Sequence, residues 1–304
     1  MPANVKTLAL ARPRSLKAAL ATLASDPSLT PIAGCTDVYV SLQFGQRFGS
    51  GPEQRFIDLW GLKELQGISV DRDVLRIGAL TTYTEMIQSK LVQKRVPMLV
   101  AASREVGGAQ IQNAGTIAGN LCNASPAADG VPPLLAMDAA VALASAGGER
   151  LVPLAAFVTG NRKTARRADE LVTAIRVPKP VPGAASTFLK LGARRYLVIS
   201  IVMVAATIEP DERNQILRAR IAVGACSPAA QRLGALESAL NGLPIDARLA
   251  TVVCAEHLAQ ALAPIDDVRG SAHYRNDAAL TLVRRALGEL GAKMERSPNA
   301  EHSR

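Results

Sequence analysis

The chain has 304 residues, which exceeds a single domain of roughly 100–200 residues and predicts two or three compact units. Apolar residues make up 48% and aromatic residues 3%, which excludes a disordered chain and predicts a core of Ala, Val, Leu and Ile. The formal charge of +9 would permit nucleic-acid binding. However, the basic residues are scattered and no aromatics interleave with them, so an anionic ligand or an acidic partner explains the charge at least as well.

The first 60 residues are predicted to form an α/β subdomain. Its elements, in chain order, are a helix over 15–23, a strand over 30–33, a short helix or extended stretch over 38–42 and a strand over 55–59. A second subdomain, over 61–178, has strands over 65–70, 74–77, 140–143 and 171–177, and helices over 98–106 and 132–137. Thr82 or Thr84 is expected to cap a further helix.

The proline-rich segment 178–183 is the best candidate linker, because it cannot continue a helix or a strand. A third unit over 184–291 is predicted to be an α+β domain, since strand patterns precede helical ones. Its strands are expected over 187–191, 199–208 and 217–223, and its helices over 233–240, 247–262 and 274–290. Residues 292–304 are expected to be a flexible tail.

The cysteines Cys35, Cys122, Cys226 and Cys254 lie far apart, with no CxxC pair. The sequence therefore predicts reduced thiols and neither a zinc site nor an iron–sulfur cluster. The N-terminus lacks a secretion signal, and the most apolar run, 196–208, is shorter than the ~20 residues that span a bilayer. A cytoplasmic protein without a membrane span is expected.

Two glycine-bearing segments, 32–37 and 115–120, are the most informative features of the chain. Small residues in each would leave backbone N–H groups uncovered, which is how a chain builds a concave site for phosphate oxygens without cationic side chains. Two such segments together indicate a diphosphate. A plain capping turn remains the alternative for either segment alone.

Several catalytic motifs are absent from the chain, namely GxSxG, HExxH, GxxxxGK[ST] and a GxGxxG that follows a strand. The sequence therefore lacks the patterns of serine hydrolases, zinc proteases, P-loop proteins and Rossmann-type dinucleotide enzymes. A chain with two phosphate-binding segments and no acid–base or nucleophile pattern is typical of a cofactor carrier. No catalytic residue is expected in this chain.

The segments 32–37 and 113–121 together resemble the paired flavin loops of the FAD-binding subunit of molybdenum hydroxylases, which include xanthine and carbon monoxide dehydrogenases. The resemblance covers nearly the whole chain, through the further stretches 57–59, 77–82, 125–129, 190–195 and 267–275. The usual family loops have glycine where this sequence has Cys35 and Ala118. A positive φ at either position would cost on the order of 1 kcal/mol.

The resemblance implies an α+β fold in which a two-subdomain PCMH-type FAD-binding region is followed by a smaller α+β domain of the carbon monoxide dehydrogenase flavoprotein C-terminal type. It implies that the diphosphate is bound through backbone N–H groups, the side chains of Thr36, Thr116 and Asn120, and the helix start after Asp37. The implied cofactor-binding residues are Ile32, Ala33, Gly34, Cys35, Thr36, Asp37, Gly115, Thr116, Ile117, Ala118, Gly119, Asn120, Asp129, Leu171 and Lys190.

Three of these residues have individual implied roles. Asp129 would accept a hydrogen bond from the adenosine ribose, Leu171 would pack near the cofactor, and Lys190 would lie near the isoalloxazine. The alternatives are that Asp129 caps a helix, that Leu171 is a core residue and that Lys190 is a solvated strand residue.

By resemblance, the chain is an electron-transfer subunit that carries FAD in a multi-subunit molybdenum hydroxylase. Its implied partners are a large molybdenum-cofactor subunit, a small [2Fe–2S] subunit and a small-molecule electron acceptor, namely NAD, oxygen or a quinone. The chain lacks the four-cysteine cluster insertion of some relatives, so no metal is expected in it. The alternatives are a self-contained flavin oxidoreductase of the same fold and a scaffolding subunit without flavin.

Overall fold

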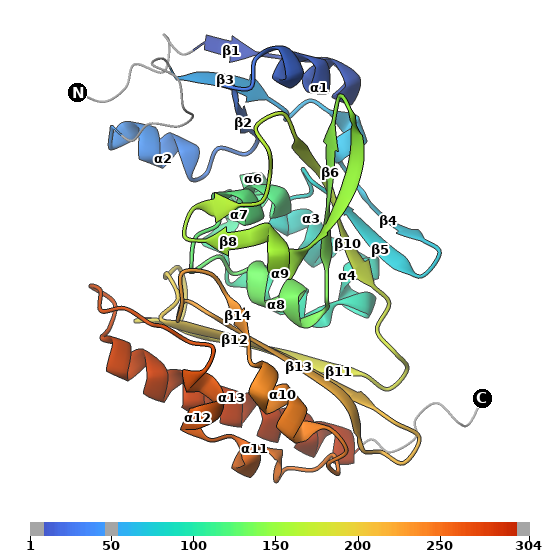
Figure 1. Ribbon diagram of the computed structural model, residues 1–304, viewed down its shortest axis with the longest axis vertical. Helices are drawn as coiled ribbons and strands as arrows, with labels where there is room; N and C mark the ends of the chain where they lie inside the picture. The colour runs from blue at the N-terminus through green and yellow to red at the C-terminus, as the bar shows by residue number, and fades with distance from the viewer. Residues whose placement is uncertain (1–8, 46–53, 297–304) are drawn as a thin grey trace.

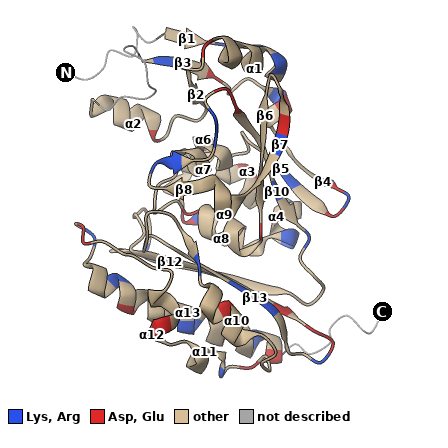
Figure 2. Ribbon diagram, viewed as in Figure 1, with Lys and Arg blue, Asp and Glu red and all other residues tan. Residues whose placement is uncertain are grey.

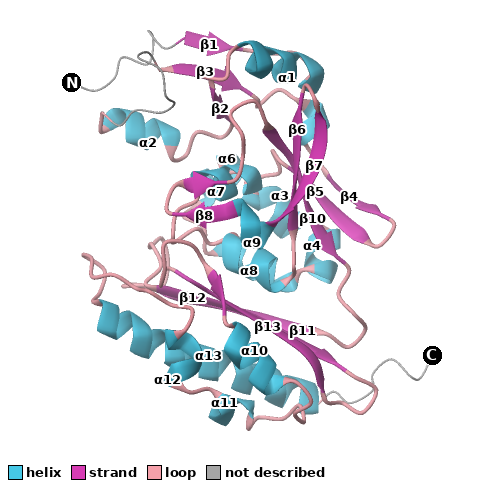
Figure 3. Ribbon diagram, in the orientation of Figure 1, coloured by secondary structure: helices cyan, strands magenta, loops and turns pink. Residues whose placement is uncertain are grey.

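The computed structural model describes residues 9–45 and 54–296. Within these residues the strands form three sheets and a two-stranded ribbon. The sheets are stacked along the long axis of the molecule, with helices between them and along the outer face of the last sheet (Figure 1, Figure 3). The chain therefore builds three layers in sequence order.

The first layer is a parallel sheet with the strand order β1-β3-β2. Its elements are β1 (Ala9–Ala11), α1 (Leu16–Ser25), β2 (Thr30–Ile32), α2 (Val38–Gln43) and β3 (Arg55–Asp58). The Ser15 side chain accepts a hydrogen bond from the backbone N–H of Ala18 at the start of α1. Ala19 and Leu23 of this helix are buried. The helix, both strands and the helical alternative for 38–42 are confirmed here.

The middle layer is an antiparallel sheet with the order β4-β5-β10-β6-β7. Its strands are β4 (Ile68–Asp71), β5 (Val74–Gly78), β6 (Ala140–Ser145), β7 (Gly148–Pro153) and β10 (Leu171–Pro178). Strand β7 was not predicted, because it is a polar edge strand in which Val152 is the one buried residue. The predicted strand over 65–70 starts too early, because Leu65 belongs to the 3-10 turn η2 (Lys63–Leu65).

Short helices cover the middle sheet, and a small ribbon lies beside them. They are α3 (Tyr83–Gln88), α4 (Lys90–Arg95), α5 (Pro97–Arg104), α6 (Ala109–Ala114), α7 (Ile117–Asn123), α8 (Val131–Ala136) and α9 (Leu154–Phe157), with the ribbon β8 (Val158–Gly160) and β9 (Lys163–Thr164). Thr82 caps α3 and forms a reciprocal capping box with Glu85, so of the two predicted caps Thr82 is the correct one.

The third layer is an antiparallel sheet with the order β11-β12-β13-β14, which is covered by helices on its outer face. Its elements are β11 (Ala185–Leu191), β12 (Val202–Pro210), β13 (Ile216–Gly224), β14 (Gln231–Arg232), α10 (Gly234–Leu240), α11 (Leu249–Val252), α12 (Ala255–Ala259) and α13 (Ala272–Glu295). The helix predicted over 247–262 is wrong as one element, because Val253 and Cys254 are extended and separate α11 from α12.

Two further predicted bounds in the third layer need correction. The strand predicted over 199–208 begins only at Val202. The predicted tail over 292–304 is also partly wrong, because α13 continues through Glu295. The rest of the predicted tail, 297–304, lies outside the described residues.

The sheet of the third layer is buried on both faces. Helix α13 and α10 pack on one face, and α5 and α8 of the middle layer pack on the other. Strand β12 is accordingly buried at every position from Val202 to Glu209. The Arg220 side chain also donates to the carbonyl of Ala136 across this junction, with an N···O distance of 2.9 Å. Residues on both sides of 178–183 therefore share one tightly packed boundary.

Charged residues of both signs are distributed over the three layers (Figure 2). In the described part of the chain, none of the helices combines the length and the apolar character needed to cross a bilayer. Nor does any group of three or more His, Cys, Asp or Glu among the described residues have an arrangement that could hold a metal ion.

Candidate functional site

The first glycine-bearing turn leaves its backbone N–H groups open. It follows β2 directly and ends where α2 begins, at Asp37. In the described part of the chain, the N–H groups of Gly34, Cys35, Thr36 and Asp37 donate no hydrogen bond. Four consecutive unused N–H groups are donors that suit phosphate oxygens.

The second segment is built differently from what the sequence predicts. Instead of an open loop, Thr116 is the N-cap of α7, and its side chain accepts a hydrogen bond from the N–H of Gly119 at 3.0 Å. The N–H groups of Ile117 and Ala118 donate to the carbonyls of Thr81 and Ala79. The expectation of uncovered N–H groups along 115–120 is therefore wrong, because these donors serve to hold α7 against the middle sheet.

The two segments nevertheless lie against each other, although they are far apart in sequence. A Cβ atom built on Gly34 would lie 1.6 Å from the carbonyl oxygen of Ala114 and 3.3 Å from the nitrogen of Gly115. A Cβ atom on Gly115 would lie 3.6 Å from Oγ1 of Thr36. Glycine is thus required at position 34 by the close approach of the two backbones.

Cys35 and Ala118, which stand where the family loops have glycine, have different backbone conformations. Cys35 has a φ of +56°, in the left-handed region that favours glycine. Its Sγ contacts the carbonyl oxygen of Ala33 at 3.2 Å, and burial together with the charge of Asp58 raises the pKa of its thiol. Ala118 lies within α7 and has no such strain. Only the Cys35 position carries a backbone cost.

Asp129 and Lys190, which the resemblance assigns to opposite ends of the cofactor, are partners in a buried ion pair. The Nζ of Lys190 lies 2.8 Å from Oδ1 of Asp129 and 3.0 Å from the carbonyl oxygen of Glu105. Ser200 donates to the same carboxylate oxygen at 3.2 Å. Burial raises the pKa of Asp129, and the Lys190 ammonium opposes that shift. The pair joins β11 to the turn before α8.

The solvated alternative for Lys190 does not hold, since its side chain is only 5% exposed. Leu171, the first residue of β10, is buried in the core of the first two layers. Asn120 accepts a hydrogen bond from the N–H of Gly130 through its Oδ1, which leaves its amide NH₂ without a partner in the described residues.

Tyr83 is a candidate site residue that the sequence did not reveal. Its hydroxyl is buried and has no hydrogen-bond partner in the described residues. A Cβ atom on Gly130 would lie 3.2 Å from this hydroxyl and 2.9 Å from Oδ1 of Asn120, so the three groups adjoin. Burial, followed by the charges of Asp129 and Asp37, raises the pKa of Tyr83, which therefore remains a neutral donor. Its pattern in the sequence is that of an ordinary core aromatic residue.

Comparison with known proteins assigns the family. Residues 5–180 match the model described as the FAD binding domain in molybdopterin dehydrogenase. The chain belongs to this FAD-binding family. Residues 187–290 match the CO dehydrogenase flavoprotein C-terminal domain, which confirms the predicted class of the third unit. FAD is accordingly the cofactor of this chain, and the chain belongs to the oxidoreductases.

The similarity extends over almost the whole length of several relatives. The chain is 31% identical to the xanthine dehydrogenase FAD-binding subunit of Escherichia coli O157:H7 over 92% of this chain and 95% of that protein. It is 34% identical to the nicotinate dehydrogenase FAD-subunit of Eubacterium barkeri over 74% and 73%. A carbon monoxide dehydrogenase chain of Hydrogenophaga pseudoflava superposes with a TM-score of 0.87 and 28% identity, over 95% of this chain and 98% of that one.

The described residues fit a bound FAD. The open N–H groups of the first turn suit a diphosphate, and the Thr36 hydroxyl and the Asn120 amide NH₂ are free donors. The unpartnered Tyr83 hydroxyl is a further buried donor nearby.

Proposed function

We propose that this chain is the FAD-carrying electron-transfer subunit of a multi-subunit molybdenum hydroxylase. The observation that carries the proposal is the first turn, where four consecutive backbone N–H groups are open beside a second backbone segment at contact distance. The family match adds the identity of the cofactor. When bound, the flavin supplies the redox chemistry, accepting electrons singly and releasing them in pairs.

The residues of this chain would bind and orient the cofactor. The N–H groups of Gly34 to Asp37 would donate to the diphosphate, with the Thr36 hydroxyl beside them. The remaining residues of the two segments are Ile32, Ala33, Gly115, Thr116, Ile117, Ala118, Gly119 and Asn120, and they would form the walls. The Asp129–Lys190 pair would fix β11 and the third layer against the cofactor site.

The partners belong to the proposal as well. Relatives named as FAD-binding subunits or medium chains support an assembly with a large molybdenum-cofactor subunit and a small [2Fe–2S] subunit. Electrons would pass from the iron–sulfur partner to the flavin and then to NAD, oxygen or a quinone. The substrate pocket would lie in another polypeptide, because the relatives are named as FAD-binding subunits or medium chains. We propose a cytoplasmic location.

Purification from the native host tests this function. We expect the chain to carry FAD and to co-purify with one large molybdenum-containing chain and one small iron–sulfur chain. The oxidised iron–sulfur partner and the flavin should both be reduced when the substrate of the complex is added. A flavin-containing chain that turns over small reductants without partners would support a self-contained oxidoreductase instead. A chain that takes up no FAD would support a scaffold.

A further inference from the structure

A thiol and an imidazole are in contact at the start of α12. The Sγ of Cys254 lies 3.2 Å from Nδ1 of His257. The backbone N–H of Cys254 donates to the same nitrogen, at 3.4 Å. Because an N–H can only donate, Nδ1 is the unprotonated nitrogen of this ring, and the thiol is the donor in its contact with the ring. The pair is therefore arranged for proton transfer from sulfur to nitrogen.

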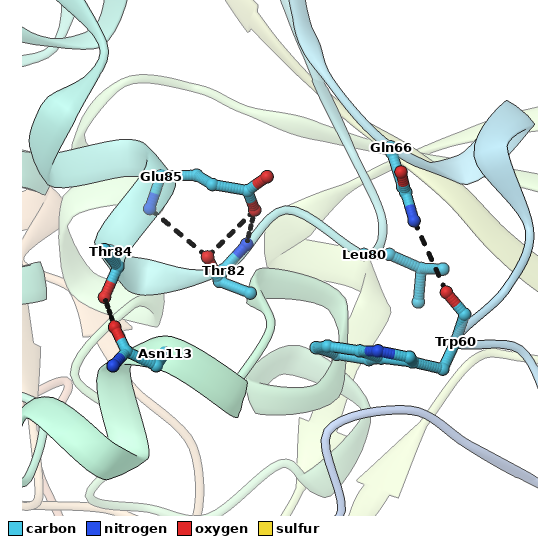
Figure 4. Close-up of a pocket in the computed structure, with 7 residues that line it drawn as sticks. All are labelled: Trp60, Gln66, Leu80, Thr82, Thr84, Glu85 and Asn113. Atoms are coloured by element: carbon cyan, nitrogen blue, oxygen red, sulfur yellow. Dashed lines mark hydrogen bonds between the residues drawn. The ribbon is translucent and has the colours of Figure 1, made fainter.

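This pair lies apart from the cofactor segments. Helix α12 is on the outer side of the third layer beside α13, whereas the two segments belong to the first and middle layers (Figure 1). The pocket of about 380 Å³ between the end of β3 and the start of α3, whose lining includes Trp60 and Glu85, also belongs to those two layers (Figure 4). The function proposed above uses neither Cys254 nor His257.

The backbone on both sides of the thiol is anchored, while the thiol itself can be reached. The Nε and Nη2 of Arg284, on α13, donate to the carbonyl of Val253 at 3.0 and 2.9 Å. Val253 and Leu258 are buried in the core of the third layer. The side chains of Cys254 and His257 belong to residues that are only partly buried. A small reagent in solution can therefore approach a thiol whose position is fixed.

Charged groups of both signs surround the pair. Arg284 places a guanidinium at the residue before Cys254, which favours a thiolate. Glu256 has a lowered pKa, first because the Cys254 thiol donates to it, and also because of the charge of His257. The thiol thus faces a carboxylate and an imidazole, and an imidazole is the group that accepts a proton near neutral pH. The carboxylate in turn stabilises the imidazolium that forms.

The other three cysteines lack this arrangement. Burial raises the pKa of the thiols of Cys35, Cys122 and Cys226, to about 11 for Cys122 and about 12 for Cys226. Among the residues that the structure describes, none of these three thiols contacts a histidine. A thiol held in the protonated form is a poor nucleophile, because the thiolate is the reacting species. The four cysteines should therefore differ in reactivity.

We propose that Cys254 is a site of reversible S-thiolation by a low-molecular-weight disulfide such as oxidised glutathione, with His257 as the proton acceptor. His257 takes the thiol proton, and the Cys254 thiolate attacks one sulfur of the disulfide. A bond forms between Sγ and that sulfur, and the S–S bond of the reagent breaks. The released thiolate takes the proton from His257 and leaves as a free thiol. Cys254 is oxidised, and one half of the reagent is reduced.

Peptide mass spectrometry of the full-length chain tests the proposal. The chain as purified is incubated with oxidised glutathione, samples are quenched over time, and the adduct is quantified at each of the four cysteines. We expect the adduct at Cys254 to form about tenfold faster than at any other cysteine, since exchange follows the fraction of thiolate. Dithiothreitol should remove it completely, because a mixed disulfide is reversible whereas sulfinic acid is not.

A conservative variant separates proton transfer from structure. In His257→Asn the Oδ1 atom still accepts the N–H of Cys254, but the side chain cannot take up a proton. We expect the rate at Cys254 to fall by about tenfold or more. His273→Asn is the matched control, because His273 is an exposed histidine on α13 that pairs with Asp277. The control should react at the rate of the parent chain, and thermal unfolding reports whether both variants are folded.

Each outcome decides the proposal. Equal rates at Cys254 and at the other cysteines would overturn it, as would an unchanged rate in a folded His257→Asn variant. A rate at Cys254 that falls equally in His273→Asn would overturn it too, because it would indicate a general effect of losing a histidine. The adduct is measured without reference to the flavin, so these results do not depend on the proposed function.

Discussion

Gly34 faces the carbonyl group of Ala114 so closely that a Cβ atom at position 34 would lie 1.6 Å from the carbonyl oxygen. This contact holds the first turn against the second segment. Because the obstacle is backbone, it cannot move aside by rotating a side chain. The two segments can therefore lie this close only because residue 34 has no Cβ atom.

Gly34→Ala should push the first turn away from Ala114 and abolish FAD retention. Overpacking of this kind costs about 2 kcal/mol, so the chain should fold but unfold at a lower temperature. The measurement is the visible flavin absorbance per protein chain after purification, together with thermal unfolding. Gly234→Ala is the control, because nothing lies within 4 Å of a Cβ atom there. Full flavin content in Gly34→Ala would contradict the close contact.

Glycine substitutions at the two departures from the family loops should have opposite effects. Cys35→Gly relieves a left-handed residue and should raise the free energy of unfolding by about 1 kcal/mol. Ala118→Gly places glycine inside α7 and should lower it by about 1 kcal/mol. Denaturant unfolding measures both. Cys35→Ala removes the thiol but keeps the strained conformation, so it should not stabilise the chain. An equal rise in the free energy of unfolding for Cys35→Gly and Cys35→Ala would contradict the strain.

The buried pair of Lys190 and Asp129 should show strong coupling. Lys190→Met leaves the Asp129 carboxylate buried with only the Ser200 hydroxyl, which should cost about 3 kcal/mol of unfolding free energy. The double variant Lys190→Met/Asp129→Leu should recover most of that loss, because it removes the buried charge as well. A double-mutant cycle by denaturant unfolding gives the coupling energy. Additive losses would show that the two side chains act independently.

Acid should weaken the contact between Arg150 and Glu170. The Arg150 guanidinium lowers the pKa of Glu170, and the N–H of Arg167 contributes to the shift. A lowered folded-state pKa means that this stabilisation is present above the ordinary glutamate pKa and is lost as the pH falls through the folded value. The unfolding temperature of Glu170→Gln should therefore decline less steeply below the ordinary glutamate pKa than that of the parent chain. Parallel declines would contradict the coupling.

Most elements of the fold could be predicted because their patterns are local. The capping residues Ser15 and Thr82 and the alternation at 74–77 act within a few residues of the chain. The edge strand β7 could not be predicted, because its own sequence is polar and its extended form depends on pairing with β6. The helix α7 escaped because 115–120 has the composition of a loop, while the N-cap of Thr116 and the contacts with Thr81 and Ala79 make it helical.

The sequence predicts the two segments of the site, but not how they are arranged in space. The sequence indicates that Gly34 and Gly115 matter, yet only the fold shows that the first turn keeps its N–H groups open while the second uses them. The partnership of Asp129 and Lys190 depends on how β11 packs over the middle layer. Tyr83 carries no local signal, since a buried aromatic residue near the start of a helix is ordinary in sequence.

Because helices cover both faces of the third sheet, the chain is not expected to unfold in parts or to be separable into folded fragments. The proline-rich crossing at 178–183 resembles a hinge in sequence, but a cut there would expose the apolar faces of both halves, including the buried length of β12. Each half expressed alone should aggregate, and the intact chain should melt in one cooperative transition. The first and middle layers share one continuous apolar core as well, so a cut between them would expose buried side chains in the same way.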